Sequence, residues 1–263
     1  YGAVQGLTEF LPISSSGHLA IAALLLGEGG QDNVAFFLLL HLATFIAVCL
    51  VYWKDIWELL KELILFIPQT IRKHPSQNPE ARRLLGLMIL SLLPLFLVLP
   101  FQSELKETFD NPFIIGAALL CTAVLLFFAN RRKNNGKNVA EITVKDALII
   151  GVAQLFAVIP GLSRSGTTLA AGLFCGLERE TAVKYSFILS LPTILGAVIL
   201  EYKAIFTLAN QNLGPYLIGF VTAGLLGYAA IGLVRFLSRT GRLSIFSVYC
   251  ALVGTALIVS QLV

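Results

Sequence analysis

Charged side chains are scarce in this chain. Asp, Glu, Lys and Arg make up 13% of its 263 residues, whereas soluble domains carry about 25%. The hydrophobic fraction is 57% and the mean hydropathy is +0.83, and this composition excludes an ordinary water-soluble domain. The net charge of +4 requires no nucleic-acid partner, because basic residues also anchor a protein beside anionic lipid. We therefore predict a protein embedded in the membrane.

Cysteines with the spacing of a disulfide framework or a metal site are also absent. The four cysteines, at positions 49, 121, 175 and 250, are scattered through apolar runs. Cysteines in such positions are usually small packing residues. The cysteines therefore indicate neither a redox function nor a zinc function.

Apolar runs long enough to cross a bilayer occur six times. Two further apolar regions, 1–27 and 146–176, are interrupted by Pro, Gly and Ser. Broken backbone is tolerated in hydrocarbon only where protein or a water-filled cavity covers it, so both regions are interpreted as re-entrant helix pairs. The predicted fold is an all-α polytopic membrane protein with six transmembrane helices plus two re-entrant helix-loop-helix hairpins. The six runs cover residues 36–53, 84–100, 112–130, 185–201, 215–234 and 243–262.

The distribution of Lys and Arg predicts the orientation. If the segment after residue 53 is cytoplasmic, cytoplasmic segments hold sixteen of the 19 basic residues and outer loops hold only Lys106 and Lys203. The remaining one, Arg164, lies inside the second broken region. This excess follows the positive-inside rule. We expect the first broken region to be entered from outside and the second from inside.

The first broken region carries an unusually polar stretch. Residues 5–18 read Q-G-L-T-E-F-L-P-I-S-S-S-G-H. Gln5 and Glu9 are four residues apart and share a helix face, and Pro12 ends that helix. The serines at 14, 15 and 16 are candidate N-caps for a second helix that carries His18. The stretch therefore predicts a helix, a break and a second helix, with a carboxylate on one side and hydroxyls and an imidazole on the other.

The second broken region contains P-G-L-S-R-S-G-T-T from Pro160 to Thr168. A charge near the middle of the membrane costs about 2.5–3.5 kcal/mol on insertion scales, so Arg164 should have a partner. Glu9 is the one carboxylate expected at a comparable depth. An Arg164–Glu9 ion pair that locks the two halves is one interpretation, and an anion clamp is the other. The neighbouring Ser and Thr at a helix start favour the clamp.

A shift of 149 residues aligns the two halves of the chain. Gln5 falls on Gln154 and Thr44 on Thr193, with no gap between them. We predict one membrane domain, residues 1–263, built as an inverted-topology repeat. Its parts are repeat one at 1–130, a connector at 131–145 and repeat two at 146–263. The inversion would make two helix N-termini face each other, which favours a phosphate between them.

These two motifs closely resemble those of the undecaprenyl-diphosphatase family, the BacA/UppP type of bacterial lipid pyrophosphatase, and the resemblance covers essentially the whole chain. It implies conversion of undecaprenyl diphosphate to undecaprenyl phosphate plus inorganic phosphate, which recycles the lipid carrier for cell-wall synthesis. It also implies dependence on a divalent metal, Mg²⁺ or Ca²⁺, held near Glu9. The location it implies is the bacterial inner (plasma) membrane, with the active site facing the periplasm.

The residue assignments follow the two motifs. Expected catalytic residues are Glu9, Ser15, His18 and Arg164. The attack on phosphorus could come from Ser15 with His18 as its base, or from His18 itself. The position of Ser15 at a helix N-terminus favours the serine. His41, among leucines, is interpreted as a polar residue that faces the helix bundle. The expected substrate-binding residues are Gln5, Ser14, Ser16, Ser163, Ser165, Thr167 and Thr168.

Two other functions fit parts of the pattern. Inverted repeats with paired hairpins also build secondary transporters, so a polyprenyl-phosphate flippase is the main alternative. A type-2 phosphatidic-acid phosphatase is less compatible, because the basic first motif and final His-x-x-x-Asp of that family are missing. A nucleophile and a base beside Arg164 favour the enzyme, since binding alone needs neither. The partner is a polyprenyl diphosphate lipid, and the sequence leaves open whether the protein is a homodimer.

Overall fold

The computed structural model describes residues 1–27, 34–72, 76–132, 136–206 and 213–262. The described part is helical, apart from one isolated β-bridge between Lys137 and Leu177. The prediction of an all-α protein is confirmed for these residues. In order, the helices are α1 (Gly2–Phe10), α2 (Ser15–Leu26), α3 (Val34–Val51), α4 (Trp53–Arg72), α5 (Pro79–Leu92), the 3-10 helix η1 (Leu93–Phe101), α6 (Gln102–Thr108), α7 (Pro112–Asn130), the 3-10 turn η2 (Val139–Glu141), α8 (Val144–Phe156), α9 (Arg164–Phe174), α10 (Arg179–Leu200), α11 (Tyr202–Phe206), α12 (Leu213–Arg239) and α13 (Ser244–Val259).

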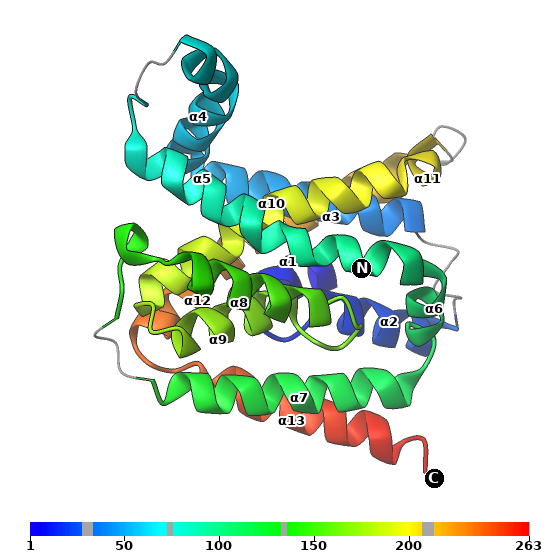
Figure 1. Ribbon diagram of the computed structural model, residues 1–263. Helices are drawn as coiled ribbons and strands as arrows, with labels where there is room; N and C mark the ends of the chain where they lie inside the picture. The colour runs from blue at the N-terminus through cyan, green and yellow to red at the C-terminus, as the bar shows by residue number, and fades with distance from the viewer. Residues whose placement is uncertain (28–33, 73–75, 133–135, 207–212, 263) are drawn as a thin grey trace.

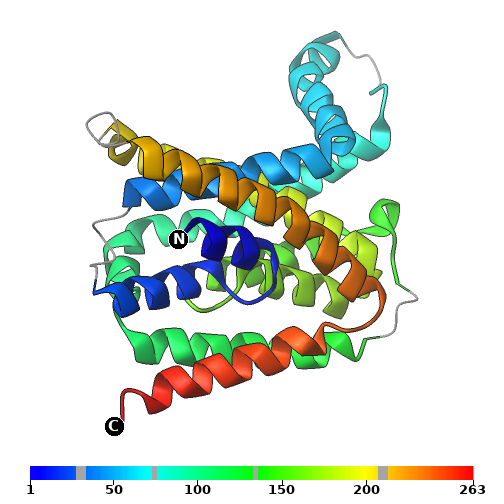
Figure 2. The same cartoon turned by 180° about the vertical axis from the view of Figure 1, so that it is seen from behind.

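Five helical stretches of the described chain are long and apolar enough to cross a membrane. They are α3, the continuous stretch Pro79–Leu105, α7, α10 and α12. The sixth predicted span, 243–262, forms α13, which has 16 residues. At 1.5 Å per residue α13 is about 24 Å long, somewhat less than the roughly 30 Å hydrocarbon core. It packs along α7 at one edge of the bundle (Figures 1 and 2).

Both broken regions contain the predicted interruption. Residues 11–14 separate α1 from α2, and residues 157–163 separate α8 from α9. Each second helix begins at a serine cap: Ser14 Oγ accepts from the Gly17 amide at 3.2 Å, and Ser163 Oγ accepts from the Gly166 amide at 3.1 Å. These bonds satisfy amides that a helix start would otherwise leave free.

The two breaks pack directly against each other. A Cβ on Gly17 would lie 3.0 Å from Gly161 of the second break, and a Cβ on Gly166 would lie 3.2 Å from Pro12 of the first. Ser165 Oγ also donates to the Leu11 carbonyl at 3.3 Å. Glycine at these places lets the two backbones approach closely enough for polar groups of both breaks to share one space.

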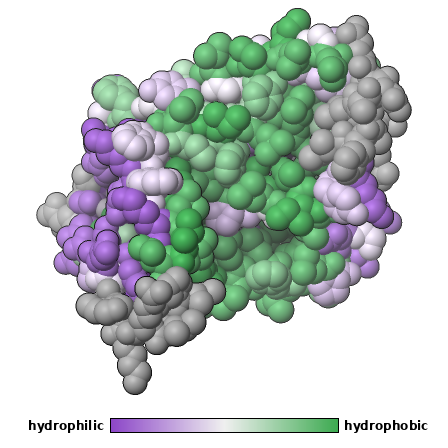
Figure 3. All heavy atoms as spheres, turned by 90° about the horizontal axis from the view of Figure 1, so that it is seen from above, coloured by the Kyte–Doolittle hydropathy of each residue, from purple (hydrophilic) through white to green (hydrophobic). Residues whose placement is uncertain are grey.

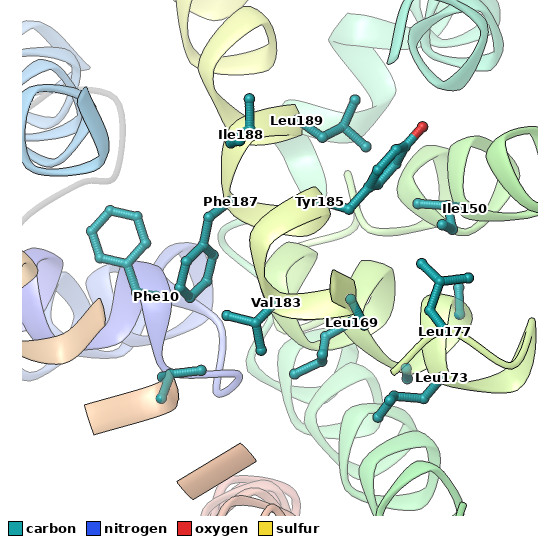
Figure 4. Packing of buried hydrophobic residues seen from close by; sticks show 14 of the residues in the cluster. Phe10, Ile150, Leu169, Leu173, Leu177, Val183, Tyr185, Phe187, Ile188 and Leu189 are labelled. Atoms are coloured by element: carbon teal, nitrogen blue, oxygen red, sulfur yellow. The ribbon is translucent and has the colours of Figure 1, made fainter. Parts of the chain in front are cut away.

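The hydrophobic core lies where α10 meets both broken regions. Phe10 of α1 contacts Phe187 of α10 edge to face, with ring centroids 5.3 Å apart. On the other side of α10, Tyr185 lies near Ile150 of α8 (Figure 4), and its hydroxyl is 2.8 Å from Ser91 Oγ of α5. α10 therefore contributes core side chains that contact both broken regions.

An arm formed by α4 and the start of α5 projects from one end of the bundle (Figure 1). Trp53 and Trp57 on α4 are exposed, as expected for an interfacial helix. The Trp residues lie in the first turns of this 20-residue helix. α5 then begins at Pro79, with Asn78 as its cap.

The surface is divided into an apolar middle and hydrophilic ends. Across the face in Figure 3 the middle is apolar, and hydrophilic residues gather towards two opposite ends. A belt of this kind is what contact with lipid requires, because charges are costly in hydrocarbon. The arrangement is that of a polytopic membrane protein.

We predict that Gly161→Ala destabilises the protein more than Gly176→Ala. Both glycines have positive φ, +94° and +84°, so either substitution should cost about 1–2 kcal/mol of backbone strain. An alanine at 161 would also overlap the Ile115 carbonyl, whereas nothing lies within 4 Å at 176; overpacking adds about 1–3 kcal/mol. Thermal unfolding in detergent measures the difference. Equal losses would contradict the close packing of the second break.

Candidate active site

A cavity of about 260 Å³ lies where the two breaks meet. Polar groups of both broken regions line it, together with residues from α3, η1 and α10. Its apolar wall is formed mainly by the end of α8 and by α10. The lining residues are Glu9, Ser14, Ser15, Ser16, His41, Leu95, Gln154, Ala157, Val158, Leu162, Ser163, Arg164, Ser165, Thr193, Ile194 and Ala197.

Glu9 is the centre of the polar contacts in this cavity. Glu9 is only 4% exposed, and a buried carboxylate is tolerated only when it is paired and hydrogen-bonded. Ser15 Oγ donates to Oε2 at 2.5 Å and Gln5 Nε2 donates to the same oxygen at 2.9 Å. Arg164 forms an ion pair with Oε1. The four residues come from both sides of the first break and from the second.

Arg164 is held by its place at the start of α9. Its guanidinium bonds Glu9 and, through Nη1, the Ser190 carbonyl at 3.3 Å. The predicted Arg164–Glu9 pair is therefore present. Because the side chain is still 18% exposed and lines the cavity, the same guanidinium can reach an anion that enters.

The serines divide into caps and a candidate nucleophile. The side-chain oxygens of Ser14 and Ser163 accept the cap hydrogen bonds described above. Ser16 and Ser165 each lie 3.2 Å from the neighbouring cap hydroxyl. Ser15 alone among these five directs its hydroxyl to a carboxylate. That contact makes Ser15 the serine best placed to lose a proton.

Two predicted substrate contacts lie away from the cavity wall. Thr168 Oγ1 donates to the Arg164 carbonyl at 2.8 Å and lies 2.6 Å from Ser186 Oγ. Thr167 Oγ1 is buried without a hydrogen-bond partner among the described residues. Neither residue belongs to the lining of the polar cavity. Thr168 instead bonds back to its own helix and links α9 to Ser186 of α10.

His18 is turned away from Ser15. Its Nδ1 donates to the Ser14 carbonyl at 2.8 Å, since a carbonyl can only accept. Its Nε2 lies 2.8 Å from the Tyr249 hydroxyl of α13, and the two rings are stacked. The expected hydrogen bond between His18 and a serine hydroxyl is not among its contacts within the described chain. The structure thus brings together Gln5, Glu9, Ser15 and Arg164 and leaves His18 beside them.

His41 is one of the cavity residues that the sequence analysis does not assign to the site. It lines the cavity from α3, and its Nε2 lies 3.6 Å from Glu9 Oε2. Its Nδ1 donates to the Phe37 carbonyl at 2.8 Å, which fixes the ring. An ionisable side chain in mid-span is by default a candidate for a functional site. That signal was present in the sequence, but the surrounding leucines favoured a structural interpretation.

Gln154 and Thr193 also line the cavity. Thr193 Oγ1 donates to Gln154 Oε1 at 3.5 Å. Both positions were found by the shift of 149 residues, as the counterparts of Gln5 and Thr44, and neither was assigned to the site. The repeat is therefore the sequence signal that identifies these two positions.

Few oxygen ligands for a cation converge here. Within the described residues, no group of three or more His, Cys, Asp and Glu side chains could hold a metal. Glu9 contributes its carboxylate oxygens at the cavity wall, whereas Gln5 Oε1 is buried outside the lining and has no hydrogen-bond partner in the described chain. Mg²⁺ often takes only one or two carboxylates, with substrate phosphates and waters completing its shell. The donor set fits such an ion.

Comparison with known proteins identifies the family. The family model described as "Bacitracin resistance protein BacA" matches residues 1–256. Proteins named "Undecaprenyl-diphosphatase" are similar over nearly their whole length. The chain is 40% identical to that of Methanococcus maripaludis strain C6, over 95% of this chain and 94% of the relative.

Two further relatives match to a similar degree. The identity is 37% to the protein of Methanosphaera stadtmanae, over 100% of this chain and 96% of the relative. It is 37% to that of Bacteroides thetaiotaomicron, over 99% and 97%. A match this complete shows that the chain belongs to the BacA family.

Proposed function

We propose that this protein removes the terminal phosphate from undecaprenyl diphosphate, giving undecaprenyl phosphate and inorganic phosphate. Relatives that share 36–40% of their residues with it are named undecaprenyl-diphosphatases. The observation that carries the proposal is the 2.5 Å contact from Ser15 Oγ to Glu9 Oε2, in a cavity that Arg164 also lines. A nucleophile, a proton acceptor and a phosphate-binding cation then act in one place.

Glu9 acts as the general base in this mechanism. The Ser15 proton passes to Glu9 Oε2, and Ser15 Oγ attacks the terminal phosphorus. The bond from that phosphorus to the bridging oxygen breaks, and undecaprenyl phosphate leaves with its new terminal oxygen. Glu9 gives its proton to the leaving phosphate. It then takes a proton from the water that attacks the phosphoserine and passes it to Ser15 Oγ as the bond from Oγ to phosphorus breaks and inorganic phosphate is released. This assignment replaces His18 with Glu9 as the partner of Ser15.

Arg164 binds and stabilises the phosphate oxygens. Its planar fork of donors suits a phosphate better than a single ammonium would. The amino ends of α2 and α9 both lie at the cavity, through Ser15 and Arg164, and helix N-termini favour anions. The Glu9 ion pair keeps the guanidinium oriented before substrate arrives, so little reorganisation is needed during the reaction.

A divalent metal would be held by Glu9 together with substrate oxygens. Such an ion, Mg²⁺ or Ca²⁺, would neutralise negative charge on the phosphate groups. Gln5 Oε1 is buried outside the cavity lining and has no partner in the described chain. The same amide donates through Nε2 to Glu9 and so orients the base.

We also propose that the two halves are inverted copies with re-entrant broken regions. Packing contacts recur at the offset of 149 residues. Gly17 meets Gly161 while their counterparts Gly166 and Pro12 meet each other. The serine pairs 14 and 16, and 163 and 165, have the same 3.2 Å separation. This reciprocity is what a two-fold relation would produce.

The proposed orientation is that of a protein in the bacterial inner membrane. The α4 arm and the connector after α7 lie at the same end of the bundle (Figure 1), and both are rich in Lys and Arg. The positive-inside rule would place that end in the cytoplasm. The cavity is then open to the periplasm. The contact between Ser15 and Glu9 favours hydrolysis over transport, since a flippase needs no activated hydroxyl.

We predict that Ser15→Ala abolishes phosphate release and that Glu9→Gln lowers kcat by about 10²–10⁴-fold, the range for loss of a general base. Ser16→Ala is the matched comparison, because Ser16 lines the same cavity but has no contact with Glu9 among its hydrogen bonds. Its loss should be smaller than about tenfold. The measurement is phosphate release from purified protein and a prenyl diphosphate. Near-normal turnover by Ser15→Ala would exclude the serine.

Variants of Arg164 can distinguish its proposed binding of phosphate from its ion pair with Glu9, which joins the two halves. Arg164→Ala leaves Glu9 buried without its cation and should cost about 3–5 kcal/mol of stability. Arg164→Lys keeps the charge but loses the planar fork, so we predict near-normal stability with a KM raised about tenfold. Melting temperature and kinetics in the same detergent test this. A stable Arg164→Lys protein with unchanged KM and kcat would show that Arg164 only locks the halves.

A further inference from the structure

Two apolar hollows lie beside the polar cavity and share residues with it. The first has a volume of about 330 Å³ and lies between η1 and the end of α8, where Leu97, Phe101 and Leu155 line it. Val158 belongs both to this hollow and to the wall of the polar cavity. Val158 is therefore the wall that the polar cavity and this apolar hollow share.

The second hollow is larger and lies beside the first. Its volume is about 850 Å³, and it lies between α7 and the second broken region. Phe156 and Ile159 line both hollows, and Leu162 lines this one and the polar cavity. The three spaces thus lie side by side around the end of α8 and the second break.

We propose that these two hollows hold the prenyl chain of the lipid substrate. The inference rests on the proposed function, because a diphosphate placed at Arg164 requires its apolar chain to leave the cavity through an apolar wall. The chain passes Val158, bends at Phe156 and Ile159 and then follows α7. From Phe113 to Leu125 this path is about 18 Å long at 1.5 Å per residue, enough for several isoprene units.

The occupant is a prenyl chain rather than an ordinary acyl chain, because only the substrate's chain is tied to the polar cavity. Lipid tails are as apolar as the groove, so moving the chain into it gains little from hydrophobic burial. Recognition depends instead on the fit of the chain to the walls. A long prenyl chain can fill both hollows, whereas the short farnesyl chain can fill only part of them. Chain length therefore affects kcat/KM through residues far from the phosphate.

Ala117→Trp tests this by filling the middle of the α7 hollow. Ala229→Trp is the matched control, because Ala229 is an exposed alanine on α12 outside the described hollows. We expect Ala117→Trp to lower kcat/KM for undecaprenyl diphosphate about tenfold relative to the value for farnesyl diphosphate. The control should keep the wild-type ratio. An unchanged ratio in Ala117→Trp would overturn the proposal.

A binding measurement keeps this test independent of catalysis. Cys121 is exposed and lines the α7 hollow, so it reports occupancy when the half-buried Cys49 and Cys175 are replaced by serine. In Ser15→Ala protein, undecaprenyl diphosphate should slow maleimide labelling of Cys121 several-fold, and farnesyl diphosphate or inorganic diphosphate should not. Equal labelling with all three would refute the groove. Absence of phosphate release from wild type would refute the proposed function alone.

Discussion

The structure depends on one buried ion pair that joins two distant parts of the chain. Glu9 and Arg164 are 155 residues apart, and each would be costly to bury without the other. Their pairing requires both broken regions to meet at the same depth. It also places a carboxylate, a guanidinium and the Ser15 hydroxyl in one small space. A single electrostatic requirement therefore fixes the fold and assembles the chemistry.

Small residues make that pairing geometrically accessible. Glycines at 17, 161 and 166 allow the breaks to touch, and serine caps satisfy the amides that each break exposes. Larger side chains would separate the breaks, and uncapped amides would be unsatisfied in an apolar surrounding. Backbone contacts between the two breaks, rather than flexible side chains, thus fix the position of the polar site.

Much of this could be predicted from residues alone. The pairing of Arg164 with Glu9 could be predicted, because an isolated charge inside the membrane needs a partner. Pro12 and the serine clusters located both breaks. Side-chain direction was less accessible. A helical spacing of three or four residues allows His18 to reach a serine hydroxyl, but the ring instead stacks on Tyr249 of α13, a contact 231 residues away that local periodicity does not encode. His41 entered the site for the same reason, through the packing of α3 against α1.

The central claim is that Glu9, oriented by Arg164, activates Ser15 as the nucleophile. Rapid quenching of the protein during turnover of a prenyl diphosphate, followed by mass spectrometry of its peptides, locates the phosphate directly. Our account predicts an acid-stable phosphate on Ser15. Acid-labile phosphate on His18, with Ser15 unmodified, would contradict it.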